Sequence, residues 1–231
     1  MRSHEASRPR PLLRLRPRPV RARAPSERSP ITAPHGPADP FPSGARVAHK
    51  LLVDHPKLVK KAVILDICPT LAMYNATDQL FATAYYHWFF LIQPSPFPED
   101  VILAAPATFG RKQLGGMHAP LSVFHPDALD SYMTQLADAQ GVHAMCEDYR
   151  AAATIDLEEA GEDIDKGRKI QCPIKVLWGK YGLIEKCFDA VKEWQKVSAA
   201  DVQGDVVDCG HYIPEEKPEV VLQTVKEFLV D

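Results

Sequence analysis

The sequence predicts an α/β fold in which helices pack on a parallel sheet. Three apolar runs have the length of buried strands, at residues 62–67, 174–179 and 204–208. Between and around them lie segments whose apolar residues recur at helical spacing. Strands that alternate with helices are typical of a parallel sheet covered on both faces. We therefore expect a parallel sheet with these three runs as its strands.

The helices follow from the same periodicity. "GARVAHKLLVD" at 44–54 places alanine, valine and leucine on one face, and "DHP" ends the run. Residues 69–165 read as mostly helical and rich in aromatic side chains, which predicts a helical block inserted between two strands. One amphipathic helix is expected after residue 179 and through Trp194. The last helix is expected to begin near Pro218, because proline suits the first turn of a helix.

The amino-terminal segment differs in composition from the rest. Residues 1–42 contain nine arginines, ten of the 21 prolines, three acidic residues and no lysine, so their net charge is +6 although the whole chain carries −3. Phe41 is their one aromatic residue. So little apolar surface cannot offset the entropy lost on ordering. We therefore expect residues 1–43 to be a disordered Arg/Pro-rich arm.

Three origins compete for this arm. A transit peptide would be rich in arginine and serine, but the repeated prolines prevent the amphipathic helix that such peptides form. Clustered arginines suit nucleic acid, yet no aromatic stacking residues accompany them, which disfavours that partner. Arginine, proline, alanine and serine without lysine are what GC-rich coding DNA yields out of frame. We favour this third interpretation.

Other features point to a protein of the reducing cytoplasm. No apolar run approaches the ~20 residues that a membrane span requires. No metal-ligand cluster and no glycine-rich phosphate loop is present, so we expect no metal and no cofactor. The cysteines are odd in number, widely spaced and without a C-x-x-C pair, which predicts free thiols. They are Cys68, Cys146, Cys172, Cys187 and Cys209.

Several uncommon strings occur in a fixed order: "GARVAHKLLVDHP", "LDICPT", "YYHWFFLIQP", "CEDYRAAATIDLE", "CPIKVLWG" and "CGHYIPEEKPE". With them the chain resembles the haloacetate (fluoroacetate) dehalogenases, which are α/β-hydrolases related to epoxide hydrolases. The resemblance covers residues 44–231. It implies the carboxyl-terminal part of an α/β-hydrolase domain, a helical cap over about 70–165, and a small haloacetate-like carboxylate as substrate.

The resemblance also implies a reaction. In this family an aspartate displaces halide from the α-carbon, and water activated by a histidine hydrolyses the resulting ester. His211 matches the histidine and Asp66 the acid that orients it, while Glu185 is a weaker candidate for that acid. The position of the nucleophile is taken by Pro42, which has no nucleophilic atom. We therefore expect the chain to be inactive as a dehalogenase.

The remaining site residues are implied in the same way. The family holds the substrate carboxylate with two arginines, of which one is present as Arg46 and the other is replaced by Ser43. The halide donors match His87, Trp88 and Tyr149. The neighbouring aromatic residues are expected to be packing residues of the cap. They are Tyr85, Tyr86, Phe89 and Phe90.

Two further expectations concern the chain as a whole. The family fold has eight strands and its nucleophile follows the fifth, whereas three strands are readable here. This predicts a truncated or mis-joined copy, in which the strand at 62–67 is an exposed edge that favours self-association; a homodimer stays open. Two alternatives to the dehalogenase interpretation also remain. One is a non-catalytic remnant that binds a partner or a small carboxylate, and the other is a relative of the epoxide hydrolases.

Overall fold

The computed structural model describes residues 44–115 and 119–230 of the 231-residue chain. The expected arm at 1–43, with Pro42 and Ser43, lies outside the described residues. All statements below concern the described ranges.

The centre of the fold is a parallel sheet. Strands β1 (Ala62–Leu65), β2 (Ile174–Gly179) and β3 (Val202–Val207) pair in the order β1-β2-β3. In the register, Ile64 lies opposite Val176. The three predicted strands are confirmed, and β3 begins two residues earlier than its apolar run suggested. Parallel neighbours need a crossover connection, which the helical segments between the strands provide.

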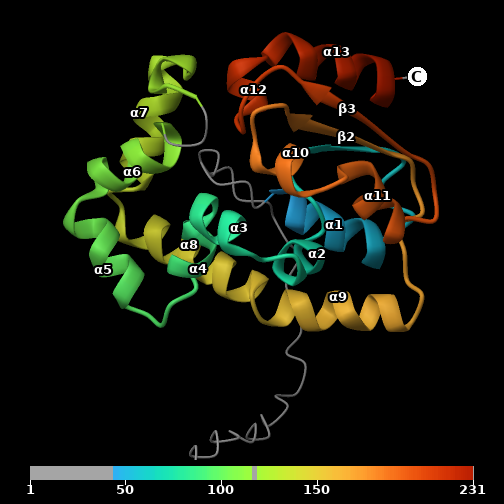
Figure 1. The fold of residues 1–231 in the computed structure, drawn as a ribbon, viewed down its shortest axis with the longest axis horizontal. Coiled ribbons are helices and arrows are strands. Elements are labelled where there is room, and N and C mark those ends of the chain that lie inside the picture. Colours follow the sequence, from blue (N-terminus) through green and yellow to red (C-terminus); the bar gives the residue numbers. More distant parts are fainter. Residues whose placement is uncertain (1–43, 116–118, 231) are drawn as a thin grey trace, which may run out of the picture. The chain divides into compact units, whose positions relative to one another are not determined.

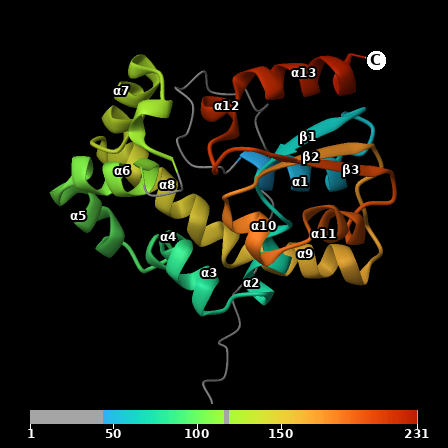
Figure 2. The same ribbon diagram turned by 45° about the horizontal axis from the view of Figure 1, so that its top comes forward.

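Helices cover both faces of this sheet. Figures 1 and 2 show α1 (Gly44–Asp54) and α11 (Ala190–Lys196) on one side and α13 (Pro218–Leu229) on the other. The alternation of side chains along β2 matches this arrangement. Val176 belongs to the main core, which also contains residues of α1 and α11, whereas Leu177 packs in a smaller cluster with α13. Burial on both faces explains why β2 is an almost continuous apolar run.

The single helix expected through Trp194 is wrong, because the chain forms two helices there. The first, α10 (Leu183–Cys187), ends before Phe188, whose backbone is extended. Asp189 then accepts a hydrogen bond of 3.1 Å from the backbone N–H of Lys192 and so caps the start of α11. A capping carboxylate starts a new helix at this point, although the apolar spacing continues unbroken across it.

The segment between β1 and β2 is helical, and we call helices α2 to α9 the helical insert. The insert consists of α2 (Thr70–Asn75), α3 (Gln79–Ala84), α4 (Tyr86–Phe90), α5 (Phe97–Ala104), α6 (Pro106–Gly115), the 3-10 helix η1 (Leu121–Val123), α7 (Pro126–Gln135), α8 (Ala139–Ala152) and α9 (Ile155–Asp165).

No helix in the described ranges is long and apolar enough to cross a membrane.

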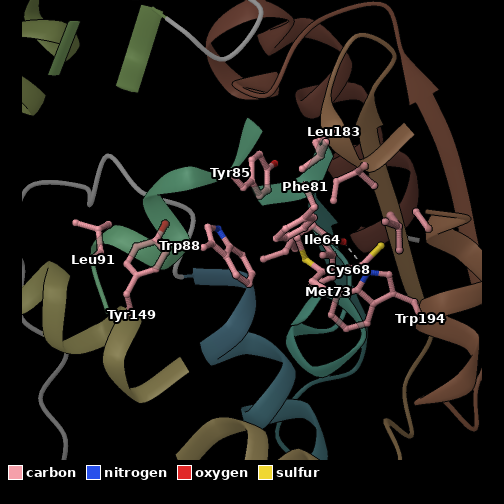
Figure 3. Close-up of a cluster of buried hydrophobic side chains, with 14 of the residues drawn as sticks. Ile64, Cys68, Met73, Phe81, Tyr85, Trp88, Leu91, Tyr149, Leu183 and Trp194 are labelled. Atoms are coloured by element: carbon pink, nitrogen blue, oxygen red, sulfur yellow. Dashed lines mark hydrogen bonds between the residues drawn. The ribbon is translucent and has the colours of Figure 1, made fainter. Parts of the chain in front are cut away.

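An aromatic cluster joins the insert to the core over the sheet. Phe81 is fully buried, and its ring centroid lies 5.8 Å from that of Trp88. Tyr149 contacts the other side of Trp88, with centroids 6.2 Å apart. Figure 3 shows Trp88 between these two rings. Edge-to-face contacts at such distances add specific geometry to the burial of apolar area, so this cluster holds α3, α4 and α8 together.

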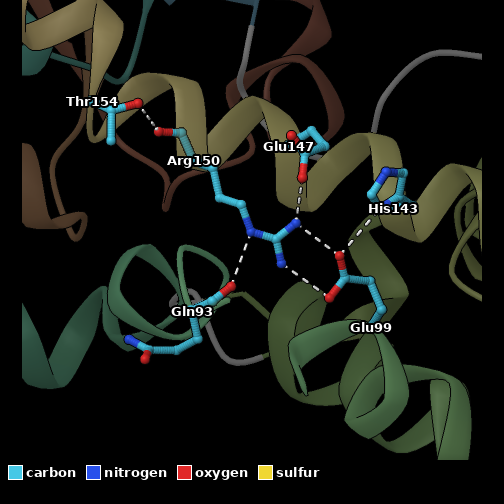
Figure 4. Close-up of polar contacts among 6 residues, drawn as sticks. All are labelled: Gln93, Glu99, His143, Glu147, Arg150 and Thr154. Atoms are coloured by element: carbon cyan, nitrogen blue, oxygen red, sulfur yellow. Dashed lines mark hydrogen bonds and ion pairs between the residues drawn. The ribbon is translucent and has the colours of Figure 1, made fainter. Parts of the chain in front are cut away.

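A polar clamp fixes α5 to α8. Arg150 donates two hydrogen bonds to the buried Glu99, of 2.8 and 3.0 Å, and a third of 2.6 Å to Glu147. Its Nε–H donates to the backbone oxygen of Gln93 at 2.9 Å. Figure 4 shows the guanidinium surrounded by these acceptors, with His143 at the far side of Glu99. The paired geometry between arginine and carboxylate is among the stronger polar contacts in proteins.

Candidate active site

Asp66 stands immediately after β1, in a backbone conformation that few residues adopt. Its φ is +46°, in the left-handed region that aspartate tolerates better than most residues. Its N–H donates to the oxygen of Leu177 at 2.7 Å, and its Oδ1 accepts a hydrogen bond of 2.8 Å from the N–H of Gly179. The side chain is therefore anchored to the end of β2. Strained backbone of this kind is frequent at functional sites.

His211 lies in the loop between β3 and the short helix α12 (Ile213–Glu216). Glu216 holds this loop through two hydrogen bonds: its carboxylate accepts from the N–H of Gly210 at 2.7 Å and from the N–H of Tyr212 at 3.1 Å. These bonds fix the backbone on both sides of His211, whose exposed fraction is 9%. The imidazole is thus buried and its position is set by its neighbours.

The structure brings Asp66 and His211 together. Asp66 Oδ2 lies 2.5 Å from His211 Nδ1. Glu185, the weaker sequence candidate for this contact, instead accepts a hydrogen bond from the indole N–H of Trp178. A carboxylate at Nδ1 selects the tautomer in which Nδ1 carries the proton. Nε2 is then left as a proton acceptor, which is the form a general base requires.

Tyr85 links this pair to the helical insert, a role that the sequence did not indicate. Its hydroxyl lies 3.5 Å from His211 Nδ1, and its ring centroid lies 5.3 Å from that of His87. Burial, with Asp66 as the next cause, raises the pKa of Tyr85 well above its ordinary value, so the phenol stays neutral. Nothing in "AYYHWFF" distinguishes Tyr85 from Tyr86, and only the long-range contact does. Tyr85 is nevertheless also a core residue, as predicted.

The three candidate halide donors lie together. His87, Trp88 and Tyr149 are all buried, and the ring centroids of His87 and Tyr149 are 5.8 Å apart. Burial lowers the pKa of His87 to about 3, with His211 and Arg46 adding to the effect, so His87 is neutral at ordinary pH. Its Nδ1 is buried and makes no hydrogen bond within residues 44–115 and 119–230. A buried polar atom without a partner is rare and is one signal of a ligand site.

Arg46, in the first turn of α1, lies beside the same aromatic residues. Its guanidinium carbon is 4.7 Å from the ring centroid of Tyr149 and 5.8 Å from that of Trp88. It forms an ion pair with Asp148. Burial by itself would lower the pKa of Arg46, but Tyr149 and Asp148 outweigh that effect and raise it above the ordinary value. The guanidinium therefore stays charged in a largely dry environment.

The six predicted site residues thus form one array, connected through Tyr85. Phe89 and Phe90 pack against the main core, as expected for residues of a cap. Pro42 and Ser43, the positions where the nucleophile and the first arginine were expected, lie outside the described residues. The array contains Arg46, Asp66, His87, Trp88, Tyr149 and His211.

The thiols do not supply a substitute nucleophile. All five cysteines are free. Burial raises the pKa of Cys146 and of Cys209 to about 12, and it raises the pKa of Cys68, two residues after Asp66, further still. Since the thiolate is the reactive form, these cysteines are inert at ordinary pH.

Within the described residues, one cluster has the donor atoms of a metal site. Glu99, His143 and Glu147 bring their ligand atoms within 4.8 Å of one another. The guanidinium of Arg150 bonds to both carboxylates, however, and occupies the place of a cation. We therefore assign this cluster to the clamp between α5 and α8.

Among the curated proteins that resemble the chain, two match it over 189 residues each. The fluoroacetate dehalogenase of Burkholderia sp. is 38% identical, across 81% of this chain and 61% of that protein. The soluble epoxide hydrolase of Corynebacterium sp. strain C12 is 23% identical, across 80% of this chain and 63% of that protein. The chain thus spans about three fifths of the length of the curated relatives it matches. No protein-family profile matches it.

Solved structures agree with this result. A Nostoc sp. PCC 7120 protein assigned to the alpha/beta hydrolases is 50% identical with a TM-score of 0.77, across 81% of this chain and 63% of that one. A variant of a Pseudomonas aeruginosa protein assigned as an epoxide hydrolase, solved with MFA bound, is 38% identical with a TM-score of 0.75, across 80% of this chain and 62% of that one. The chain therefore has the fold of part of an α/β-hydrolase, and over about three fifths of that protein's length it is similar in sequence to a fluoroacetate dehalogenase.

Proposed function

We propose that residues 44–230 carry the hydrolytic half of a haloacetate dehalogenase site, with the helical insert as its cap. The observation that carries this proposal is the buried contact between Asp66 and His211 beside the neutral His87. Asp66 holds the proton of His211 on Nδ1, and Nε2 takes a proton from water as that water attacks an aspartyl ester. The relation to the Burkholderia enzyme supports the substrate class.

The insert supplies the leaving-group side of this site. Fluoride is small and poorly polarisable, so its departure requires several aimed donors in a site from which water is excluded. Neutral His87, the indole of Trp88 and the phenol of Tyr149 are buried donors on two helices. Arg46 supplies a charged, buried group for the substrate carboxylate.

We further propose that this chain does not release fluoride. Proline stands at position 42, where the related enzymes would carry the nucleophilic aspartate, and proline cannot form the ester. A nucleophile held in line contributes ~7–11 kcal/mol of barrier lowering through proximity. Without an ester, His211 and Asp66 have no intermediate to hydrolyse. Ser43 does not replace the aspartate, because an alkyl ether formed at serine is not hydrolysed by this route.

A fluoride-electrode assay tests the proposal directly. The purified chain is incubated with fluoroacetate beside the Burkholderia fluoroacetate dehalogenase as a positive control. We expect fluoride release at the rate of the buffer alone. Fluoride release that the chain sustains and that the His211→Ala variant loses would contradict the proposed inactivity.

A second candidate function is favoured by one relationship. The Corynebacterium protein named as a soluble epoxide hydrolase matches this chain over 189 residues. Two buried tyrosines of the array, Tyr85 and Tyr149, carry hydroxyl groups that can donate hydrogen bonds. Such donors suit the oxygen of an opening epoxide. Measuring diol formation from an epoxide in parallel with fluoride separates the two candidates. Diol formation that depends on Tyr149 would favour the epoxide hydrolase.

A further inference from the structure

One ion pair at the site joins a buried cation to a carboxylate that water can reach. The side chain of Arg46 is 3% exposed, whereas that of Asp148 is 31% exposed. The two residues are 102 positions apart, one in the first turn of α1 and the other in α8. The cation is therefore fixed inside the fold, and its partner stands between it and solvent.

The guanidinium of Arg46 is buried against aromatic rings, so a negative charge next to it stabilises the fold. The rings of Tyr149 and Trp88 lie against the guanidinium, so much of its surface contacts aromatic carbon. A buried charge that loses its counter-ion is strongly destabilising. Asp156 in α9 also interacts electrostatically with Arg46, and burial raises the pKa of Asp156 above its ordinary value. Asp148 is the carboxylate that forms the ion pair with Arg46 in the folded chain.

Two further side chains that interact electrostatically with Arg46 are uncharged at ordinary pH. Burial raises the pKa of Tyr74 to about 12 and lowers the pKa of His87 to about 3, and both side chains are neutral. A small carboxylate that reaches Arg46 meets a buried cation that already forms an ion pair with Asp148. Two carboxylates on one guanidinium repel each other, so the ligand and Asp148 compete for Arg46.

We propose that Asp148 is a resident counter-ion that occupies the anion clamp of Arg46, and that a small monocarboxylate binds by replacing it. This inference rests on the proposed role of Arg46 in binding the substrate carboxylate. The partial exposure of Asp148 lets its side chain turn towards water when the ligand enters. Asp148 then determines how tightly the site binds monocarboxylates and how strongly it prefers them to neutral analogues.

The central experiment compares acetate binding by the chain and by two variants with the same change in net charge. Asp148→Asn removes the resident carboxylate, while Asp130→Asn removes an exposed carboxylate of α7. Binding is measured by calorimetric titration with acetate, fluoroacetate and acetamide. We expect Asp148→Asn to bind both carboxylates about tenfold more tightly and Asp130→Asn to stay within about twofold. Equal or weaker carboxylate binding by Asp148→Asn would overturn the inference.

Thermal unfolding keeps the test decisive if Asp148→Asn is unstable. The Asp148→Asn variant leaves Arg46 without this counter-ion. The midpoint temperature of its thermal unfolding should therefore be lower than that of the unchanged chain. Acetate should restore most of the difference, and acetamide should restore none. A variant that stays unfolded at saturating acetate would contradict the inference, because an external carboxylate would then be unable to replace Asp148.

Arg46→Gln separates failure of this inference from failure of the proposed function. If Arg46→Gln abolishes acetate binding while Asp148→Asn leaves it unchanged, Arg46 holds carboxylates and the role of Asp148 is wrong. If the unchanged chain and Arg46→Gln bind acetate equally, the proposed carboxylate site itself is wrong. If Asp148→Asn gains affinity and Arg46→Gln loses it, both proposals are supported.

Discussion

Asp66 Oδ2 and His211 Nδ1 are 2.5 Å apart although 145 positions separate the two residues in the chain. The contact joins the end of β1 to the loop after β3, across the end of β2 between them. In a parallel sheet the carboxyl ends of all strands meet at one edge, where ligand sites form. The pair is thus a consequence of sheet topology, and its hydrogen bonds determine which nitrogen of His211 is available.

Asp66→Asn should change the tautomer of His211. The amide oxygen can still accept from Gly179, but the amide nitrogen then faces Nδ1 as a donor, so the imidazole proton should move to Nε2. Asparagine tolerates the left-handed backbone, so the strand end should keep its conformation. Nitrogen NMR of the imidazole measures the tautomer, and we expect a stability loss of about 1–3 kcal/mol in urea. An unchanged tautomer would show that Asp66 does not orient His211.

Gly179→Ala should disrupt the site through a steric clash. A Cβ at this position would lie 1.9 Å from the backbone oxygen of Gly210, beside His211. Neither backbone segment can move without breaking the sheet or the loop, so we expect a loss of about 4 kcal/mol or more. Urea unfolding monitored by tryptophan fluorescence measures it.

Gly161→Ala is the matched control for that change. A Cβ at Gly161, within α9, meets no atom within 4 Å. Alanine is the better helix former by roughly 0.5–1 kcal/mol, so this variant should be slightly more stable than the unchanged chain. Similar losses for both variants would mean that the clash at Gly179 does not exist.

His87 should stay neutral in the folded protein down to acidic pH. Burial is the main cause that lowers its pKa from 6.5 to about 3. Because the unfolded chain takes up this proton below pH 6.5 and the folded chain does not, the contribution of His87 to stability falls between pH 6.5 and about 3. Carbon NMR of the labelled ring should show no titration above pH 5, a point about halfway in this window. A titration near 6.5 would contradict the burial of His87.

Glu99→Gln should remove a pH-dependent part of the stability. Hydrogen bonds from Arg150 are the main cause that lowers the pKa of Glu99 from 4.5 to about 2. The stabilisation is complete above pH 4.5 and is lost as pH falls towards 2, because the unfolded carboxylate is protonated first. At neutral pH we expect a loss of about 2 kcal/mol.

The Glu99 prediction is checked by measuring the urea concentration at the midpoint of unfolding over a range of pH. The difference between the unchanged chain and Glu99→Gln should shrink as pH falls below 4.5. Glu158→Gln, an exposed acid on α9, makes the same charge change and should lose little at any pH. A difference that is constant with pH would mean that Arg150 does not hold Glu99 ionised.

Much of the fold could be read from local patterns. The apolar runs at β1 and β2 predicted buried parallel strands, and the spacing in α1 predicted its helix and its end at Asp54. The break before α11 was missed, because apolar periodicity continues through Phe188 and only the capping contact of Asp189 interrupts the helix. Periodicity reports which face is buried, and it does not report where one helix ends and the next begins.

Some residues of the candidate site could be expected from the sequence, whereas other contacts could not. The resemblance to the haloacetate dehalogenases, which is carried by the strings around His87, Tyr149 and His211, pointed to those residues. Sequence could not single out Tyr85 from Tyr86, or pair Asp148 with Arg46, since these contacts join elements about a hundred or more residues apart.

The sequence by itself determined the strands, most helices and the types of chemical group in the array. Tertiary structure decided which of those groups are buried, which carboxylate faces which cation, and that His87 is neutral while Arg46 is charged. The physical reason is that charge state depends on loss of water and on the nearest partner. Both are set only when distant segments pack together, and no local pattern in the chain encodes them.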